Sequence, residues 1–498
     1  MVIEHLPHDI LLVILFYLDL ADLPSLAITC SDLYKVVLRD GYRIVCTREL
    51  WPTSFATRKA GVDKRWLDAS RTASAVQSTW LSLSFQQHLV SKRQRFSPRP
   101  RSAFQEQRDI IVTTDGECVE ILADGVASLS SGSTIKERQR WRAHPGDVTD
   151  MWLAREATDL DAESCWTCGV DGYIKRWNLE AAVKDTQDTE EHRTHDHRHS
   201  RNHTMKLQPD RCLQGHSGPI QGIHVDRRSP SRLLSVGIDE TVRLWDTKAE
   251  KETDQLPIHC RPWIVRFLDS DLFAVGVSRS RRRNAQTPDS VLPLFKLRPS
   301  GMEPMGVLPV DATAVYGLAS QYSSPSSLNH TVVAGCYDAV TRLFDLRSRS
   351  CVATYQDPYD HGAVYSVDYN DFRLVAGTSQ NSILRLWDMR FYTPKSTGKL
   401  KSGGIRDGVS IYLGNNWSPV YSLQMDFSKI VGATDSNVWL LDFSRTQNLS
   451  QKRQISTPSD RPFSTGRGRQ TRPRERVRQE FVGRAFYTHT DFSAYVGD

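Results

Sequence analysis

The 498-residue sequence lacks an apolar run as long as the roughly 18 residues that a membrane helix needs. Near the N-terminus, nine apolar residues follow one another from Ile10 to Leu18. The charges around this run are Glu4, Asp9, Asp19 and Asp22, whereas a signal peptide begins with basic residues. We therefore expect neither a membrane anchor nor a secretory leader.

Motifs for metals, cofactors and catalysis are also scarce. The nine cysteines are irregularly spaced, and the C-x-x-C of Cys165 and Cys168 has no second pair to complete a zinc site. This pair lies in the strand-like run CWTCGVDGYIKRW, which does not fit a thioredoxin-like site. No glycine-rich phosphate loop or G-x-S-x-G elbow stands out. We expect buried reduced thiols, no metal, no cofactor and no enzymatic activity.

Positive charge is concentrated in one segment. Residues 444–480 contain ten Lys or Arg against three Asp or Glu, a net charge of +7, although the whole chain carries only +6. A solvated disordered tail explains this composition; contact with nucleic acid is the alternative, but no folded nucleic-acid-binding module supports it. Disordered insertions are also expected at 181–210, where EEHRTHDHRHSRNH could bind metal weakly, and at the arginine-rich stretch 279–290.

Internal repeats dominate the middle of the chain. The window AHPGDVTDMWL…SCWTCGVDGYIKRWNL aligns with GHSGPIQGIHV…RLLSVGIDETVRLWDT. Two divergent copies follow, ending in VTRLFDLR and ILRLWDM, and three weaker units lie at 109–122, 262–297 and 418–443. This pattern resembles the WD repeat, which implies an all-β propeller over 105–443, with seven blades expected. Residues 481–498 are a candidate for the strand that closes the ring.

The resemblance also explains the recurrent polar residues. In a WD blade, His, Ser or Thr, Asp and Trp form a hydrogen-bonded chain that satisfies buried polar groups. Two such tetrads are implied: His144, Thr167, Asp171 and Trp177, and His216, Ser235, Asp239 and Trp245. These residues are expected to be structural rather than catalytic. Two units depart from the pattern, because one ends in Phe344 and the other has His361 and Trp387 but no acid.

The N-terminal region has a different periodicity. Apolar residues recur at helical spacing within 10–18 and again within 26–33. Two or three short helices in about 45 residues cannot bury so many apolar side chains, so the surplus surface indicates a partner.

The order of residues in LPHDILLVILFYLDLADLPSLAITCSDLY (6–34) resembles an F-box. An F-box followed by WD repeats is similar to the F-box/WD-repeat class of substrate receptors, with most similarity to its dactylin-like subgroup. The resemblance implies docking on the Skp adaptor, with cullin and RING subunits bound through it, and a propeller that holds a protein substrate for ubiquitination and proteasomal degradation. It assigns adaptor contacts to Leu6, Pro7, Ile10, Leu11, Ile14, Leu18, Leu23 and Leu26. The alternative is a scaffold that binds the Skp adaptor outside a ligase.

The predicted organisation is a small all-α F-box at 1–50, a helical or irregular linker at 51–104, the propeller at 105–443, and the basic tail at 444–480. Such a receptor is expected in the cytoplasm, the nucleus or both.

Candidate substrate-binding residues come from three similar stretches, AVYGL, AVYSV and PVYSL. They place Tyr316, Tyr365 and Tyr421 at equivalent positions, which the resemblance puts near the rim of the central channel. The equivalent residues in three other units are expected to be Thr149, Gln221 and Val265. Tyrosine suits interfaces, but packing between blades explains the pattern equally well. Arg261 and Arg266 are further candidates for substrate contact.

Overall fold

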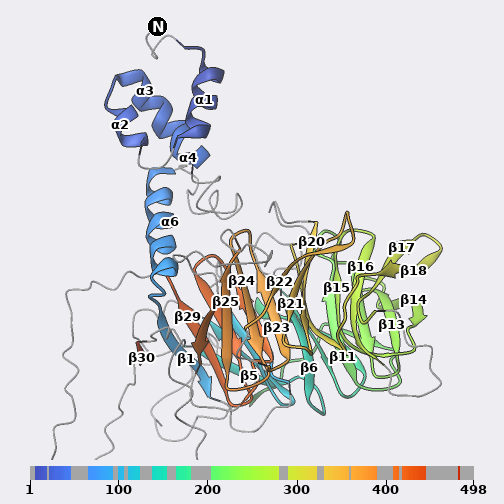
Figure 1. The fold of residues 1–498 in the computed structure, drawn as a ribbon. Helices are drawn as coiled ribbons and strands as arrows, with labels where there is room; N and C mark the ends of the chain where they lie inside the picture. Colours follow the sequence, from blue (N-terminus) through green and yellow to red (C-terminus); the bar gives the residue numbers. More distant parts are fainter. Residues whose placement is uncertain are drawn as a thin grey trace, which may run out of the picture.

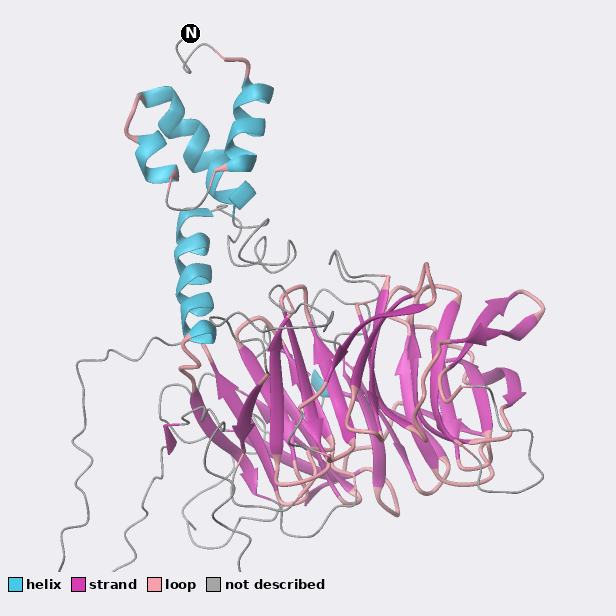
Figure 2. Ribbon diagram, viewed as in Figure 1, coloured by secondary structure: helices cyan, strands magenta, loops and turns pink. Residues whose placement is uncertain are grey.

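The computed structural model describes residues 6–18, 22–45, 66–92, 99–105, 110–123, 137–153, 164–180, 204–279, 290–321, 330–357, 361–389, 408–413, 418–444 and 481–482. A group of short helices stands on one long helix, which leads into a ring of seven β-sheets (Figures 1 and 2). The segments predicted to be disordered lie mostly outside the described residues and are untested there, but in the insert 181–210 the prediction is wrong for 204–210, which is described and contains the short strand β9 (Thr204–Met205). Among the described helices, none has the length and apolar character required to cross a membrane.

The short helices surround a small core of their own. They are α1 (His8–Tyr17), α2 (Leu23–Ala27), α3 (Ser31–Val36), the π-helical turn η2 (Val37–Gly41) and α4 (Tyr42–Val45). α1 turns Leu11 and Leu15 inward, where both are buried. At Gly41, a Cβ atom would lie 3.4 Å from the side chains of Leu15 and Leu23. These are ordinary van der Waals distances, so η2 lies in packing contact with α1 and α2 at this position.

The long helix α6 (Trp66–Leu81) connects these helices to the ring. Its first residue, Trp66, belongs to the same buried cluster as Leu15 and Leu23. The cluster continues through Val76 and Trp80 into the last two sheets. Because one continuous core spans all three parts, α6 is packed against both the short helices and the propeller rather than joined to them through the backbone alone.

The lower end of α6 is fixed by Trp80. Its ring stacks on Phe443 with centroids 3.5 Å apart, and its Nε1 donates a hydrogen bond of 2.9 Å to the carbonyl of Phe427. The guanidinium of Arg373 lies 4.4 Å from the centroid of the Trp80 ring. Stacking, hydrogen bonding and a cation–π contact thus act on one side chain.

The seven sheets are the blades of a β-propeller, and each is a meander of antiparallel strands. The inner strands of blades 1 to 7 are β2 (Ser102–Gln105), β6 (Val148–Leu153), β11 (Ile220–Val225), β15 (Arg261–Phe267), β19 (Val315–Ser320), β23 (Val364–Tyr369) and β27 (Ser422–Met425). The second strands are β3 (Ile110–Asp115), β7 (Ser164–Gly169), β12 (Arg232–Gly237), β16 (Leu272–Ser278), β20 (Thr331–Cys336), β24 (Arg373–Thr378) and β28 (Lys429–Ala433).

The third strands, in the same order, are β4 (Cys118–Ala123), β8 (Tyr173–Asn178), β13 (Thr241–Asp246), β17 (Pro293–Arg298), β21 (Thr341–Asp345), β25 (Ile383–Asp388) and β29 (Asn437–Asp442). The outer strands of blades 1 to 6 are β5 (Glu137–Arg142), β10 (Arg211–Gln214), β14 (Lys251–Pro257), β18 (Gly301–Val307), β22 (Ser350–Tyr355) and β26 (Val409–Tyr412), and β9 (Thr204–Met205) pairs in parallel with β5. The predicted combination of N-terminal helices and a seven-bladed propeller is confirmed.

The outer strand of blade 7 comes from the segment that follows α6. This strand, β1 (Gln86–Lys92), runs antiparallel to β29 and closes the ring. It corrects the expectations that 51–104 is only a linker and that 481–498 closes the ring. From that C-terminal segment, β30 (Phe481–Val482) adds one short pairing to the free edge of β1. The sequence of β1, QQHLVSK, has no apolar alternation, which explains why its strand character was not apparent.

Strand directions place α6 and the starts of the inner strands on opposite faces of the propeller. Phe443, against which Trp80 packs, directly follows β29. Tyr421 directly precedes β27, whose first residue pairs with Ala433, and Ala433 in turn pairs with Val438 near the start of β29. Tyr421 therefore lies at the end of blade 7 remote from α6. We call this side of the propeller the mouth face.

The lone C-x-x-C lies in β7, where Cys165 and Cys168 are both fully buried. Burial raises the pKa of the Cys168 thiol far above its usual value, so this thiol stays protonated. The described residues contain no group of three side chains arranged to hold a metal ion.

Candidate functional sites: an outer helical face and the channel mouth

The first candidate site is the outer face of α1. Four large apolar side chains of this helix are exposed: Ile10, Val13, Phe16 and Tyr17. Phe16 is 50% exposed, although the neighbouring Leu15 is almost completely buried. Ile28, which follows α2, is 85% exposed, so a second helix also presents apolar surface. Exposed apolar side chains concentrated on so small a domain indicate a protein-binding surface.

The eight residues assigned to adaptor contact are divided by the structure. Pro7 and Ile10 are exposed, and Leu6, Ile14, Leu18 and Leu26 are partly buried. Leu11 and Leu23 are buried in the helical core, which makes them structural instead. Val13, Phe16, Tyr17 and Ile28 are exposed as well, although they were not among the predicted adaptor contacts. Helical geometry could have identified the first two, because they lie opposite Leu11 and Leu15 on α1.

The second candidate site is the mouth of the propeller channel. In blades 2 to 6, one residue interrupts the pairing near the start of the inner strand: Thr149, Gln221, Trp263, Tyr316 and Tyr365 respectively. In blades 7 and 1, Tyr421 and Arg101 directly precede the inner strand. A bulged residue leaves the strand alternation and its side chain is redirected. These seven residues are the mouth residues.

Blade 4 differs from the prediction. Trp263, and not Val265, occupies the bulged position of β15. Val265 is fully buried between the blades. The same bulge occurs in blades 2, 3, 5 and 6, so the prediction was wrong because the divergent repeat of blade 4 was aligned two residues too far along the chain.

Four aromatic mouth residues form a continuous row. The ring of Tyr316 contacts Trp263 and Tyr365 edge to face, with both centroid distances at 5.0 Å. Tyr365 stacks on Tyr421 at 5.8 Å. All three tyrosines are half-buried. The tyrosines thus pack on one another between blades and also keep part of their surface accessible. Packing between blades and contact with a substrate are therefore compatible explanations for their positions.

Arginine side chains border this aromatic row. The guanidinium groups of Arg99 and Arg261 lie 4.6 and 4.4 Å from the centroid of Trp263. Arg99 also donates a hydrogen bond to Gln221. Burial, assisted by the charges of Arg101 and Arg261, lowers the pKa of Arg99 to about 10. Arg99 remains charged at neutral pH, so the mouth carries a concentrated positive charge.

Arg101 has a structural role inside the channel. Its Nε lies 3.0 Å from the buried Asp150 carboxylate and 3.1 Å from the carbonyl of Thr149. Its Nη1 donates to the carbonyl of Tyr421 at 2.9 Å. Arg101 therefore holds blades 1, 2 and 7 together through its Nε and Nη1.

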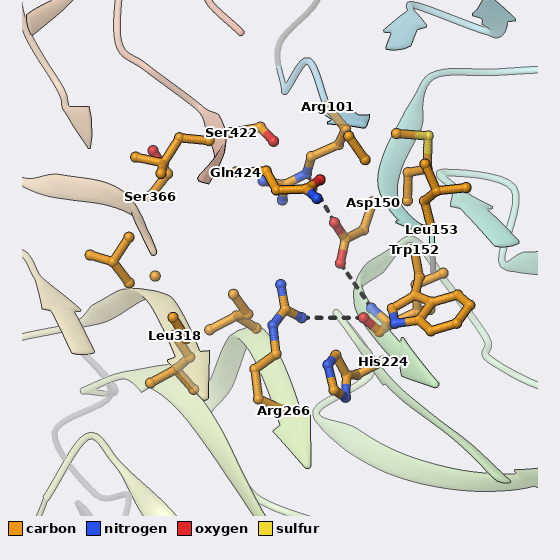
Figure 3. Close-up of a pocket in the computed structure, with 18 of the residues that line it drawn as sticks. Arg101, Asp150, Trp152, Leu153, His224, Arg266, Leu318, Ser366, Ser422 and Gln424 are labelled. Atoms are coloured by element: carbon orange, nitrogen blue, oxygen red, sulfur yellow. Dashed lines mark hydrogen bonds and ion pairs between the residues drawn. The ribbon is translucent and has the colours of Figure 1, made fainter. Parts of the chain in front are cut away.

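Arg266 follows Trp263 by three residues along β15, so it lies farther from the mouth face. Figure 3 shows Arg266 lining the pocket inside the channel together with Arg101 and Asp150. The Nη1 of Arg266 donates to the carbonyls of Val265 and Ile223, at 2.8 and 3.3 Å. The Asp150 carboxylate accepts from the amide of Ile223 at 3.0 Å on the same side of the channel. Arg261 and Arg266, which the sequence suggested together, are thus separated: only Arg261 borders the aromatic row.

The two predicted tetrads form hydrogen-bonded chains. In blade 3, His216 Nδ1 lies 3.0 Å from the Asp239 carboxylate, His216 Nε2 lies 2.7 Å from Ser235 Oγ, and Trp245 Nε1 donates to the same hydroxyl at 2.8 Å. In blade 2, the corresponding distances among His144, Asp171, Thr167 and Trp177 are all 2.9–3.0 Å.

The two departing blades lack this chain for different reasons. In blade 5, Phe344 replaces Trp, and Asp338 forms a two-point ion pair with Arg342 at 2.9 and 2.6 Å. In blade 6, His361 is exposed. The recurrent His and Asp side chains of blades 2 and 3 therefore serve blade architecture.

Replacing Asp239 with Asn should destabilise the propeller in a pH-dependent way. Burial alone would raise the pKa of Asp239, but the hydrogen bond from His216 and the charge of that histidine hold it well below the usual range. A lowered folded-state pKa stabilises the fold above the unfolded value of about 4, and this stabilisation is lost as pH falls through the folded-state pKa. We expect a loss of about 1–3 kcal/mol at pH 7, measured by urea unfolding, that shrinks as pH falls below about 4. Asp311→Asn, at an exposed carboxylate, is the control; an equal loss at every pH would contradict the assignment.

Comparisons with known proteins agree with this architecture. Residues 3–51 match the F-box-like family, and residues 207–246 match the WD domain, G-beta repeat family. Over 125 residues the chain is 30% identical to F-box/WD repeat-containing protein 4 of Mus musculus and of Homo sapiens, covering 24% of this chain and 27% and 26% of those proteins. Over 241 residues it is 26% identical to the ribosome biogenesis protein YTM1 of Laccaria bicolor, covering 44% of this chain and 48% of that protein. The matched segments thus span less than half the length of these relatives.

Proposed function

From a chain that joins an F-box-like segment to a WD-repeat propeller, we propose a substrate receptor of a Skp–cullin–F-box ubiquitin ligase. The observation that carries this proposal is the outer face of α1, where Val13 and Phe16 are exposed in a segment that matches the F-box-like family. This face is the adaptor-docking surface. Cullin and RING subunits join through the adaptor, in the cytoplasm or the nucleus. Membership of the dactylin-like subgroup stays a prediction.

The receptor contributes proximity rather than bond chemistry. α6 fixes the helices to one face of the propeller, and the mouth lies on the opposite face. A substrate held at the mouth therefore has a set position relative to the adaptor. Holding a substrate lysine near a charged ubiquitin-conjugating enzyme converts an encounter between two molecules into a local reaction.

The mouth is the surface best suited to a substrate protein. Its aromatic row offers large apolar faces with hydroxyl groups, and Arg261 adds an exposed charge. Tyrosine, tryptophan and arginine are the residue types that dominate binding energy in interfaces. Among the predicted substrate-binding residues, we retain Tyr316, Tyr365, Tyr421 and Arg261.

Changing Tyr316, Tyr365 and Tyr421 together to Ala should abolish substrate capture and leave adaptor binding intact. The expected reason is the loss of the aromatic contact surface, since each ring is part of the same row. Capture is measured as proteins that accumulate on the receptor when the proteasome is blocked. Tyr412→Ala, which removes a 40% exposed tyrosine from the outer strand β26, is the matched control. Unchanged capture by the triple variant would show that these tyrosines of the mouth do not bind the substrate.

A scaffold that binds the Skp adaptor without cullin is the competing function. Both functions use the same outer face of α1, so adaptor binding alone does not separate them. The presence of cullin in the purified complex does.

A further inference from the structure

Three turns on the mouth face present apolar side chains at matching positions. Val170, Ile238 and Tyr337 each follow the second strand of their blade, in the turns GVDG, GIDE and CYDA. They are 41%, 42% and 54% exposed. We call these three residues the rim. Isolated exposed apolar residues are ordinary, but recurrence at one position in blades 2, 3 and 5 on the same face is not expected of a solvated turn.

The backbone contacts of the rim show that these positions are equivalent. The amides of Val170, Ile238 and Tyr337 donate to the carbonyls of Asp147, Pro219 and Ala314, at 3.0, 2.9 and 3.0 Å. Each acceptor directly precedes an inner strand, two residues before a mouth residue. The hydrogen bonds therefore fix the rim beside the mouth.

The rim is continuous with the aromatic row at Tyr337. The rings of Tyr337 and Tyr316 lie 6.3 Å apart, edge to face. In blade 6, Ser379 makes the equivalent hydrogen bond to Ala363 at 2.8 Å, so the apolar character stops there. The rim is therefore one-sided: it is apolar in blades 2, 3 and 5, whereas blade 4 has Ser278 at the equivalent position and contributes Trp263 from the aromatic row.

Two exposed arginines of blade 4 lie on this side of the propeller, Arg261 and Arg279, and Arg279 forms an ion pair with Asp311 at 3.8 Å. Arg261 is exposed and stacks on Trp263 of blade 4, between the rim residues of blades 3 and 5. Within the described part of the chain, no carboxylate pairs with it. A guanidinium held by stacking keeps its donors directed outward and can accept a carboxylate with two parallel hydrogen bonds.

We propose that the rim and Arg261 bind a peptide segment in which a carboxylate side chain is flanked by apolar side chains, without any need for phosphorylation. This inference rests on the proposed function, because the peptide would be part of the substrate. The apolar side chains contact Ile238, Tyr337 and Val170, and the carboxylate pairs with Arg261. The rim and Arg261 thus determine which sequences the mouth accepts.

The surrounding residues favour a carboxylate over a phosphate or a cation. A doubly charged phosphate is bound best by several converging donors, but the Nε and Nη1 of Arg101 already bind Asp150 and backbone carbonyls, and the Asp150 carboxylate offsets the charge of Arg101. Arg99 is committed to Gln221 and to the face of Trp263. A cationic side chain would meet Arg99 and Arg261 at once. Because Arg279 is paired with Asp311, Arg261 is the guanidinium of the described part of blade 4 that can pair with a carboxylate flanked by apolar side chains.

The test is a selection of displayed random nine-residue peptides on the full-length chain. Two libraries are used: one unmodified, and one with phosphoserine fixed at the centre. Recovered unmodified peptides should be enriched in Asp or Glu close to Leu, Ile or Phe. Arg261→Gln should remove the acidic preference and keep the apolar one. Ile238→Ser should lower recovery about ten-fold, the effect of losing one buried apolar contact. Val352→Ser, at a 45% exposed apolar residue of the outer strand β22, should change nothing.

Three outcomes would overturn this inference. They are recovery from the phosphoserine library alone, enrichment of Lys or Arg, and an acidic preference that survives Arg261→Gln. The triple tyrosine variant separates the inference from the proposed substrate site. If that variant abolishes peptide recovery but the Arg261 and Ile238 variants do not, only the inference fails. If none of the three affects recovery, the mouth itself is not the binding site.

Discussion

Replacing Phe16 on the outer face of α1 with Asp should abolish binding of the Skp adaptor without unfolding the chain. Phe16 is 50% exposed and lies outside the buried helical core. An aspartate is solvated there in the free receptor, but adaptor docking would bury it in an apolar interface without a partner. That penalty should reduce adaptor affinity by more than about 100-fold. Surface plasmon resonance with immobilised adaptor measures the effect.

The control is Lys35→Asp on α3. This residue is exposed and adds the same carboxylate away from the outer face of α1. It should leave adaptor affinity nearly unchanged. Leu15→Asp provides the opposite comparison, because it places the charge in the core and should unfold the helices. An unaltered affinity for Phe16→Asp would mean that the adaptor binds elsewhere, whatever the family match.

Replacing Trp80 with Ala should release α6 from the propeller. The substitution removes the stack on Phe443, the hydrogen bond to Phe427 and the cation–π contact with Arg373. Truncation of a buried tryptophan costs about 3–5 kcal/mol, measured here as a lower free energy of unfolding in urea. Adaptor binding and peptide binding should each persist, because they use other surfaces. Ubiquitin transfer to a captured substrate should fall, because the two surfaces are no longer held at a fixed distance.

Two further variants serve as controls for Trp80→Ala. Trp80→Phe keeps an aromatic ring on Phe443 and loses the hydrogen bond, so it should cost about 1 kcal/mol. Leu81→Ala, at the neighbouring exposed residue, should have little effect on stability or transfer. Undiminished ubiquitin transfer by Trp80→Ala would show that the packing of α6 against the propeller is not required.

The sequence allowed the repeated parts of the fold to be predicted. The spacing of His216, Ser235, Asp239 and Trp245 follows from a hydrogen-bonded chain, so residue type and position are linked. Aromatic residues repeated at one position, such as Tyr316 and Tyr365, indicated a shared location for the same reason. Where the same residue types recur at a fixed spacing, that spacing is sufficient to predict where they lie in the fold.

Features that depend on local backbone geometry could not be predicted in this way. β1 is held in place by its pairing with β29, and its sequence QQHLVSK lacks the alternation of apolar and polar residues that would predict a strand. Trp263 occupies the bulged position of β15, and the divergent sequence of this blade did not fix its alignment with the other repeats, which placed Val265 there instead. Leu11 and Leu23 belong to the family pattern that suggested adaptor contact, yet the packing of α1 against η2 buries Leu11 and leaves Phe16 outside.

The most direct test of the central claim is the composition of the complex purified on the full-length chain, with wild type and Phe16→Asp compared side by side. Quantitative mass spectrometry measures the Skp adaptor and cullin in each. The receptor account predicts both subunits in comparable amounts with wild type and the loss of both with Phe16→Asp. Adaptor without cullin on the wild-type chain would contradict the ligase role and support the scaffold, and absence of both subunits would contradict the adaptor-docking surface itself.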